Sequence, residues 1–217
     1  MEALSSEILK AFEFYNNNDS YRARKKLSKA IEEAQNNIMP SLHPQSAIPL
    51  CNLFAEMTQQ ICPQDPSAAE SLYSQFCTTV EMIYGKNSCA TSDCYSTLMA
   101  YFASTRKLKL ATEYAGRALV IRIRHLGAKN VATADSHYNL ALLLRLQNDF
   151  SEAKRQFSYA LAIREELDGE SLSVASTHMA LGKTCELLGG FKEESFVHYS
   201  KVRFSAIWVY IDILTNK

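Results

Sequence analysis

The chain has 217 residues, of which 47% are hydrophobic and 21% charged, and its 23 Lys and Arg balance its 23 Asp and Glu. That length suffices for a sizeable core in one domain or for one short solenoid. A net charge of zero removes the usual electrostatic argument for binding nucleic acid or an anionic membrane surface. With only 7 glycines and 5 prolines, the composition favours helices over an all-β fold with many turns.

The sequence predicts neither a secretory signal nor a membrane span. Residues 1–19 lack a basic segment followed by an apolar core, and no apolar run approaches the about 18 residues that cross a bilayer. The 6 cysteines lie mostly inside helical patterns and without C-x-x-C spacing. In a cytosolic chain such residues are small buried apolar side chains more often than disulfides. Because the sequence predicts no secretory signal, no membrane span and no disulfide pattern, we expect a cytoplasmic protein.

Apolar residues at helical spacing predict five pairs of helices. In chain order the pairs lie at about 2–17 and 20–37, 44–61 and 66–83, 89–105 and 107–125, 131–147 and 150–167, and 172–188 and 191–214. The fourth pair has the clearest pattern. Its second helix carries a small–bulky–small stripe of Ala153, Phe157 and Ala160, and Asn148 before it tolerates the left-handed backbone that ends a helix. One such pair cannot bury its apolar stripe alone, so neighbouring copies are expected.

The copies follow a 42-residue register. Gly85, Gly127 and Gly169 recur at this spacing, and an alanine stands sixteen residues before each of them. The glycines follow second helices, where a positive φ would cap the helix. The leucines that fall midway along first helices, where they would pack within and between units, are Leu98, Leu140 and Leu181. The chain is therefore interpreted as an internal repeat.

These residues resemble the tetratricopeptide repeat (TPR). The period is longer than the usual, about 34 residues, and segments such as HLGAKNVATADSHYNLALLL resemble the kinesin-light-chain type. Arg106, where a turn glycine is expected, and Ala115, where a bulky aromatic is expected, depart from the pattern. The resemblance implies an all-α fold, a right-handed α-solenoid (TPR-like superhelix) forming a single domain over residues 1–217. Its helix pairs would span about 1–38, 43–84, 85–126, 127–168 and 169–217, the first and last degenerate.

The resemblance also implies a concave groove, lined by first helices, that binds a peptide or another protein. In such repeats the Asn of an Asn-Leu pair bonds the peptide backbone, because an amide offers both donor and acceptor. Asn139-Leu140 and Asn52-Leu53 match this pair, and Thr97 is a weaker substitute. Alternatively, Asn139 is a solvated polar residue on an unused face. The groove residues implied are Asn52, Asp93, Thr97, Asp135, Tyr138, Asn139, Leu142, Arg145 and Lys183.

Two other surfaces are alternatives to the groove. The C-terminal stripe that includes Phe204, Trp208 and Ile211 could cap the last unit or dock a partner. Basic clusters on two second helices could be solvated faces or could contact an acidic surface. The clusters are Arg22, Arg24, Lys25, Lys26 and Lys29, and Arg117, Arg122 and Arg124.

No catalytic, cofactor-binding or metal-binding residue is predicted. Gly182-Lys183-Thr184 resembles the end of a phosphate-binding loop but lacks the earlier glycine and the preceding strand. Gly182 is better explained as a small residue at a close helix crossing. The histidines match no zinc spacing, and His178 could reach Cys185, seven residues away on the same helix face, only through distortion.

The sequence thus favours a non-catalytic protein–protein interaction scaffold or adaptor, without a cofactor, membrane insertion or nucleic-acid partner. It would bind a partner segment in the groove or dock through its ends as a subunit of a hetero-complex. By analogy with the family alone, that complex would be microtubule- or cilium-associated. The alternative is a small-ligand-binding or enzymatic α-protein that uses the groove as a pocket.

Overall fold

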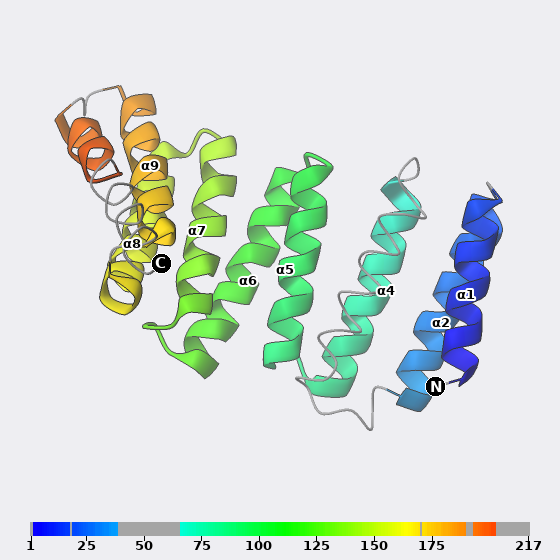
Figure 1. Ribbon diagram of the computed structural model, residues 1–217. Coiled ribbons are helices and arrows are strands. Elements are labelled where there is room, and N and C mark those ends of the chain that lie inside the picture. Colours follow the sequence, from blue (N-terminus) through cyan, green and yellow to red (C-terminus); the bar gives the residue numbers. More distant parts are fainter. Residues whose placement is uncertain (1, 18, 39–65, 170, 190–192, 203–217) are drawn as a thin grey trace, which may run out of the picture. The chain divides into compact units, whose positions relative to one another are not determined.

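The computed structural model describes residues 2–17, 19–38, 66–169, 171–189 and 193–202, and within these ranges every regular element is a helix (Figure 1). The elements are α1 (Glu2–Asn16), α2 (Ser20–Glu33), a π-helical turn η1 (Ala34–Ile38), α4 (Pro66–Tyr84), α5 (Cys89–Ser104), α6 (Leu108–Leu126), α7 (Val131–Leu146), α8 (Phe150–Asp168) and α9 (Leu172–Leu187). Residues 193–202 are also helical. Within the described residues these bounds agree with the expected helices to within a few residues. The helix expected at 44–61, and residues 203–214 of the last expected helix, lie outside the described residues.

The chain divides into two compact units, Met1–Tyr101 and Phe102–Lys217. In the first unit α1 packs against α2, and α2 also contacts α4. In the second, α6 packs against α7, α7 against α8, and α8 against α9 (Figure 1). A single domain over the whole chain stays a prediction.

The small–bulky–small stripes form the core of the helix pairs. Ala153, Phe157 and Ala160 are fully buried, and Ala23 and Leu27 of α2 repeat the arrangement in the first unit. The small side chains let a neighbouring helix approach, and the bulky one fills the space between them. The leucines expected midway along first helices, Leu98, Leu140 and Leu181, are likewise buried.

The turns have the backbone that the register predicts. The three repeat glycines, Gly85, Gly127 and Gly169, all have positive φ, as does Asn148 at the end of α7, with φ 64°. Arg106, which takes the place of a turn glycine, is held at φ 61°. An L-residue there loses about 1–2 kcal/mol relative to its preferred backbone. The turn therefore keeps its left-handed backbone at this repeat position even though the residue is not a glycine.

A threonine six residues after two of the glycines closes the turn between units, a feature that the sequence analysis did not identify. Thr91 Oγ1 donates to the carbonyl of Gly85 at 2.7 Å, and Thr133 Oγ1 donates to that of Gly127 at 2.9 Å. Both threonines are fully buried. Each bond satisfies a carbonyl at a helix end that has no partner within its own helix.

Candidate partner-binding groove

An open groove lies within the second unit, between α7, α9 and the helical segment 193–202. Its volume is about 630 Å³. The residues from α9 recur every three or four positions, so they form one face of that helix. The lining residues are Tyr138, Arg145, Leu172, Ala175, Ser176, Met179, Ala180, Lys183, Tyr199 and Val202.

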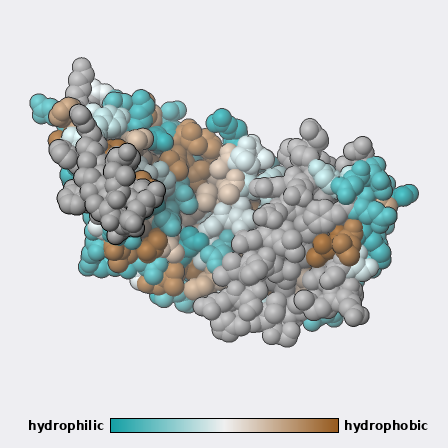
Figure 2. Space-filling model, viewed as in Figure 1, coloured by the Kyte–Doolittle hydropathy of each residue, from teal (hydrophilic) through white to brown (hydrophobic). Residues whose placement is uncertain are grey.

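The floor of the groove is apolar and exposed. Leu172 is 68% exposed and Met179 is 55% exposed. Figure 2 shows apolar surface interspersed with polar residues around the α7–α9 end of the second unit. Contiguous apolar surface rimmed by polar groups is typical of a protein-interaction site, and Met adapts its shape to different partners.

Two cations stand at the rim. Arg145 Nη1 lies 3.5 Å from the carbonyl of Ala180, and its guanidinium lies 5.6 Å from the centre of the Phe157 ring. Lys183 Nζ donates to Glu186 at 3.1 Å, and this hydrogen bond raises the pKa of the Lys183 ammonium. The ammonium therefore stays charged at neutral pH and is paired with Glu186, so the rim carries Arg145 and the Lys183–Glu186 ion pair beside an apolar floor.

Arg164 of α8 positions residues that line the groove. It is 7% exposed and donates to Asp135 Oδ1 and to Thr177 Oγ1, each at 2.6 Å. Its guanidinium also lies 4.7 Å from the centre of the Tyr138 ring, and that ring packs edge-on against Phe157. Arg164 thus ties α7, α8 and α9 together and fixes the orientation of Tyr138.

The hydrogen bond from Arg164 to the hydroxyl of Thr177 has an equivalent one repeat earlier. Arg122, 42 residues before Arg164, donates from Nη1 to Ser136 Oγ at 2.7 Å. In the sequence, Arg122 belongs to a basic cluster, and Arg164 is not among the predicted site residues. The 42-residue spacing between the two arginines could have indicated their shared role.

The structure brings three of the nine expected groove residues together in this groove, namely Tyr138, Arg145 and Lys183. Asp135 is engaged by Arg164. Leu142 packs against the core cluster around Phe157, and Asn139 is half-buried and does not line the groove.

The remaining expected residues lie elsewhere. Asp93 and Thr97 belong to α5 in the first unit, where Thr97 Oγ1 donates to the Asp93 carbonyl at 3.2 Å. Asn52, Phe204, Trp208 and Ile211 lie outside the described residues. Seven lining residues were not predicted from the sequence, and the large ones among them, Leu172, Met179, Tyr199 and Val202, are apolar or aromatic. The spacing along α9 could have revealed the first two.

The N-terminal basic cluster is partly neutralised within the first unit. Lys26 and Lys29 donate to the Glu7 carboxylate at 3.0 and 3.3 Å, and Arg22 pairs with Asp19 at 3.3 Å. The hydrogen bond from Lys26, with that from Lys29, holds the pKa of Glu7 below its usual value despite the opposing effect of burial. The cluster therefore offers less free positive charge than its sequence suggests.

The comparisons with known proteins give matches in structure alone. No protein-family model matches the chain, and no curated protein matches it by sequence. The solved structure of BtubC (BKLC) from P. vanneervenii is similar, with a TM-score of 0.70, 20% identity, and coverage of 92% of this chain and 78% of that one. The fold is that of the TPR-like repeat proteins.

Two further solved structures support this fold. A putative kinesin light chain from Podosopora anserina with nearly identical TPR-like repeats has a TM-score of 0.68 and 17% identity, covering 95% of this chain and 96% of that one. MamA has a TM-score of 0.59 and 14% identity, covering 92% and 96%. The expected all-α solenoid class is confirmed. Within a TPR-like arrangement, α7 and α9 are the first helices of their pairs, the ones that the resemblance expected to line a groove.

None of the helices in the described ranges is long and apolar enough to span a membrane.

Proposed function

We propose that this protein is a non-catalytic interaction scaffold that holds a segment of a protein partner in the groove between α7, α9 and residues 193–202. The observation that carries the proposal is the exposed apolar face of α9, with Leu172 and Met179, on the first-helix side of a TPR-like fold. Full burial of such a side chain is worth about 1.5–3 kcal/mol relative to full exposure, and these two side chains, 68% and 55% exposed, forgo part of it if nothing covers them. A partner that covers them recovers part of that free energy.

The groove defines the chemistry of the bound segment. Its volume of about 630 Å³ falls within the usual range of about 300–1,000 Å³ for ligand sites. Apolar side chains of the segment would contact Leu172 and Met179, and an acidic group would face Arg145, beside the Lys183–Glu186 ion pair. The charged rim contributes to orientation and association rate more than to affinity, so binding should weaken moderately as salt rises.

The proposal extends to the setting of the protein. The scaffold would be a subunit of a larger hetero-complex, which we place in a microtubule- or cilium-associated assembly of the cytoplasm. Support for this setting comes from the kinesin-light-chain resemblance of the sequence and from the putative kinesin light chain among the similar structures. The alternative of an enzyme is less favoured because Asp135 is engaged by Arg164 and Lys183 by Glu186.

The experiment is affinity capture of partners from cells with matched variants, followed by cross-linking mass spectrometry. Met179→Glu places a charge on the groove floor and should reduce capture of groove partners at least tenfold. Met82→Glu is the matched control, because Met82 is 63% exposed but belongs to α4 in the first unit. Partners retained by Met179→Glu, with cross-links confined to the first unit or to residues 203–217, would contradict groove binding.

A further inference from the structure

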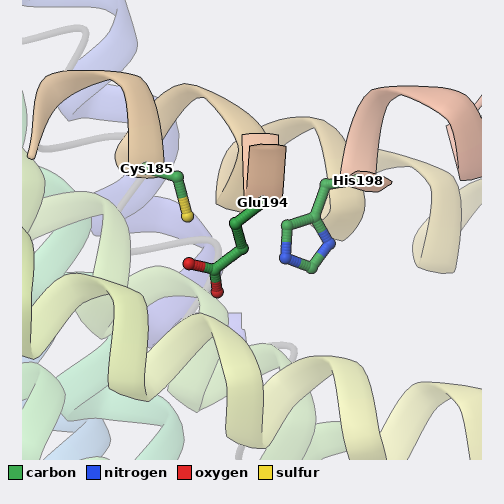
Figure 3. A group of neighbouring side chains, drawn as sticks. All are labelled: Cys185, Glu194 and His198. Carbon is green, nitrogen blue, oxygen red and sulfur yellow. The ribbon is translucent and has the colours of Figure 1, made fainter. Parts of the chain in front are cut away.

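Three side chains with metal-binding chemistry meet where α9 is followed by the helical segment 193–202 (Figure 3). Cys185 comes from α9, and Glu194 and His198 come from the following segment, one helical turn apart and therefore on one face. The Cys185 sulfur, a Glu194 carboxylate oxygen and a His198 ring nitrogen all lie within 4.8 Å of one another. Helical spacing puts Cys185 on the side of α9 away from Met179 and the groove.

The second observation is that the His198 ring is oriented by a partner on its other side. His198 Nδ1 lies 3.0 Å from His178 Nδ1, and His178 Nε2 lies 3.4 Å from a carboxylate oxygen of Glu165. His178 can therefore accept the Nδ1–H of His198 while its own Nε2–H points at Glu165. This leaves the Nε2 lone pair of His198 free, and Figure 3 shows a ring nitrogen turned toward Glu194. Histidines that bind metals are held in this way by a partner on the second nitrogen.

The charges around the cluster fit a divalent cation. One oxygen of Glu194 pairs with Lys154 at 2.7 Å, which orients the carboxylate, and the carboxylate also accepts a hydrogen bond from the Cys185 thiol. A thiolate and a carboxylate would together neutralise the two charges of the ion.

We propose that Cys185, Glu194 and His198 form a binding site for one Zn²⁺-type transition-metal ion, with water in the fourth position. Sulfur, nitrogen and oxygen donors are the set that Zn²⁺ accepts. Cysteine binds metals as the thiolate, so the ion would displace the proton of the Cys185 thiol. The ion would join α9 to the segment that carries Tyr199 and Val202 of the groove wall. The site stands independently of the proposed scaffold function.

The test is a titration of the full-length, untagged, chelator-treated chain with Co²⁺, followed by competition with Zn²⁺. We expect one Co²⁺ per chain, a cobalt–thiolate charge-transfer band in the near ultraviolet, and loss of that band when Zn²⁺ is added. Cys185→Ala should abolish the band. Glu194→Gln and His198→Gln should each weaken binding by about tenfold or more. Cys89→Ala and His137→Gln lie outside the cluster and should leave binding unchanged.

Three results would overturn the site. They are failure to bind Co²⁺ or Zn²⁺ at micromolar concentration, binding without a thiolate band, and affinity unchanged in both Glu194→Gln and His198→Gln. Circular dichroism accompanies each variant. Should Cys185→Ala lose its helical signal, the two variants at partly exposed positions decide the question.

Discussion

The ring of Tyr199 lies directly over Gly182, so that a Cβ at position 182 would stand 2.6 Å from Tyr199 Cε1. Real side chains do not approach this closely, so only glycine lets α9 and the following segment cross at this distance. This explains a glycine inside a helix, where it otherwise costs about 0.5–1 kcal/mol relative to alanine. The segment Gly182-Lys183-Thr184 is therefore a packing feature beside the groove.

Gly182→Ala and Gly116→Ala should have different effects on stability. Both glycines are helical, but a Cβ at Gly116 meets nothing within 4 Å. Gly116→Ala should raise the free energy of unfolding by about 0.5–1 kcal/mol. Gly182→Ala should lose this gain, because overpacking costs about 1–3 kcal/mol and Tyr199 must turn away. Urea unfolding measures both, and equal stabilisation by the two variants would show that the contact is absent.

Arg164→Met should lower the free energy of unfolding by about 1–3 kcal/mol, because it removes charge-assisted bonds to Asp135 and Thr177 from a buried position. Arg155→Met on the same helix is the control. The Arg155 side chain is 62% exposed and pairs across the surface with Glu152, an interaction that solvent screening leaves with little effect on stability. The measurement is chemical denaturation followed by circular dichroism. Similar losses in the two variants would mean that Arg164 does not bind the three helices together.

Arg106→Gly should stabilise the chain by up to about 1 kcal/mol. Glycine relieves the left-handed strain at φ 61° and loses part of that gain through its more flexible unfolded state. Lys107→Gly, at φ −81°, has no such strain to relieve and should destabilise. Thermal unfolding of the two variants beside the parent chain makes the comparison. A lower melting temperature in both would argue against strain at this turn.

Glu7 should make the first unit sensitive to acid. Its folded pKa lies below the ordinary value near 4.5, so the stabilisation is complete above that value and is lost as pH falls through the folded pKa. Urea unfolding between pH 7 and pH 3 should show a smaller acid loss in Glu7→Gln than in the parent chain. Glu13→Gln, an exposed carboxyl on the same helix, controls for the removal of one charge. Carbon-detected NMR titration of the Glu7 carboxyl checks the pKa itself, and a value at or above 4.5 would contradict the ion pairs.

The helices and the repeat were readable from the sequence because both depend on short-range patterns. Helix bounds follow apolar spacing and turn residues, and the positive φ of Gly127 follows from its place after a second helix. Gly182 could also be interpreted correctly, since a glycine inside an apolar helix indicates a close crossing.

Packing between helices decides which side chains line the groove. The sequence grouped Asp135, Asn139 and Leu142 on the face of one helix, but only Tyr138 and Arg145 of that helix reach the groove. Whether a side chain lines a groove depends on which neighbouring helix covers it, and that information is not local.

The same reason applies to the residues that the sequence left apart. Nothing local in the sequence distinguishes Arg164 from other arginines, and it becomes buried only because α8 packs against α7 and α9. Cys185 and His198 match no metal-binding spacing, because their donors meet only when the segment after α9 folds back along it. The sequence by itself determined the repeat and its turns, and the tertiary structure decided which side chains meet, since those contacts join residues on different helices.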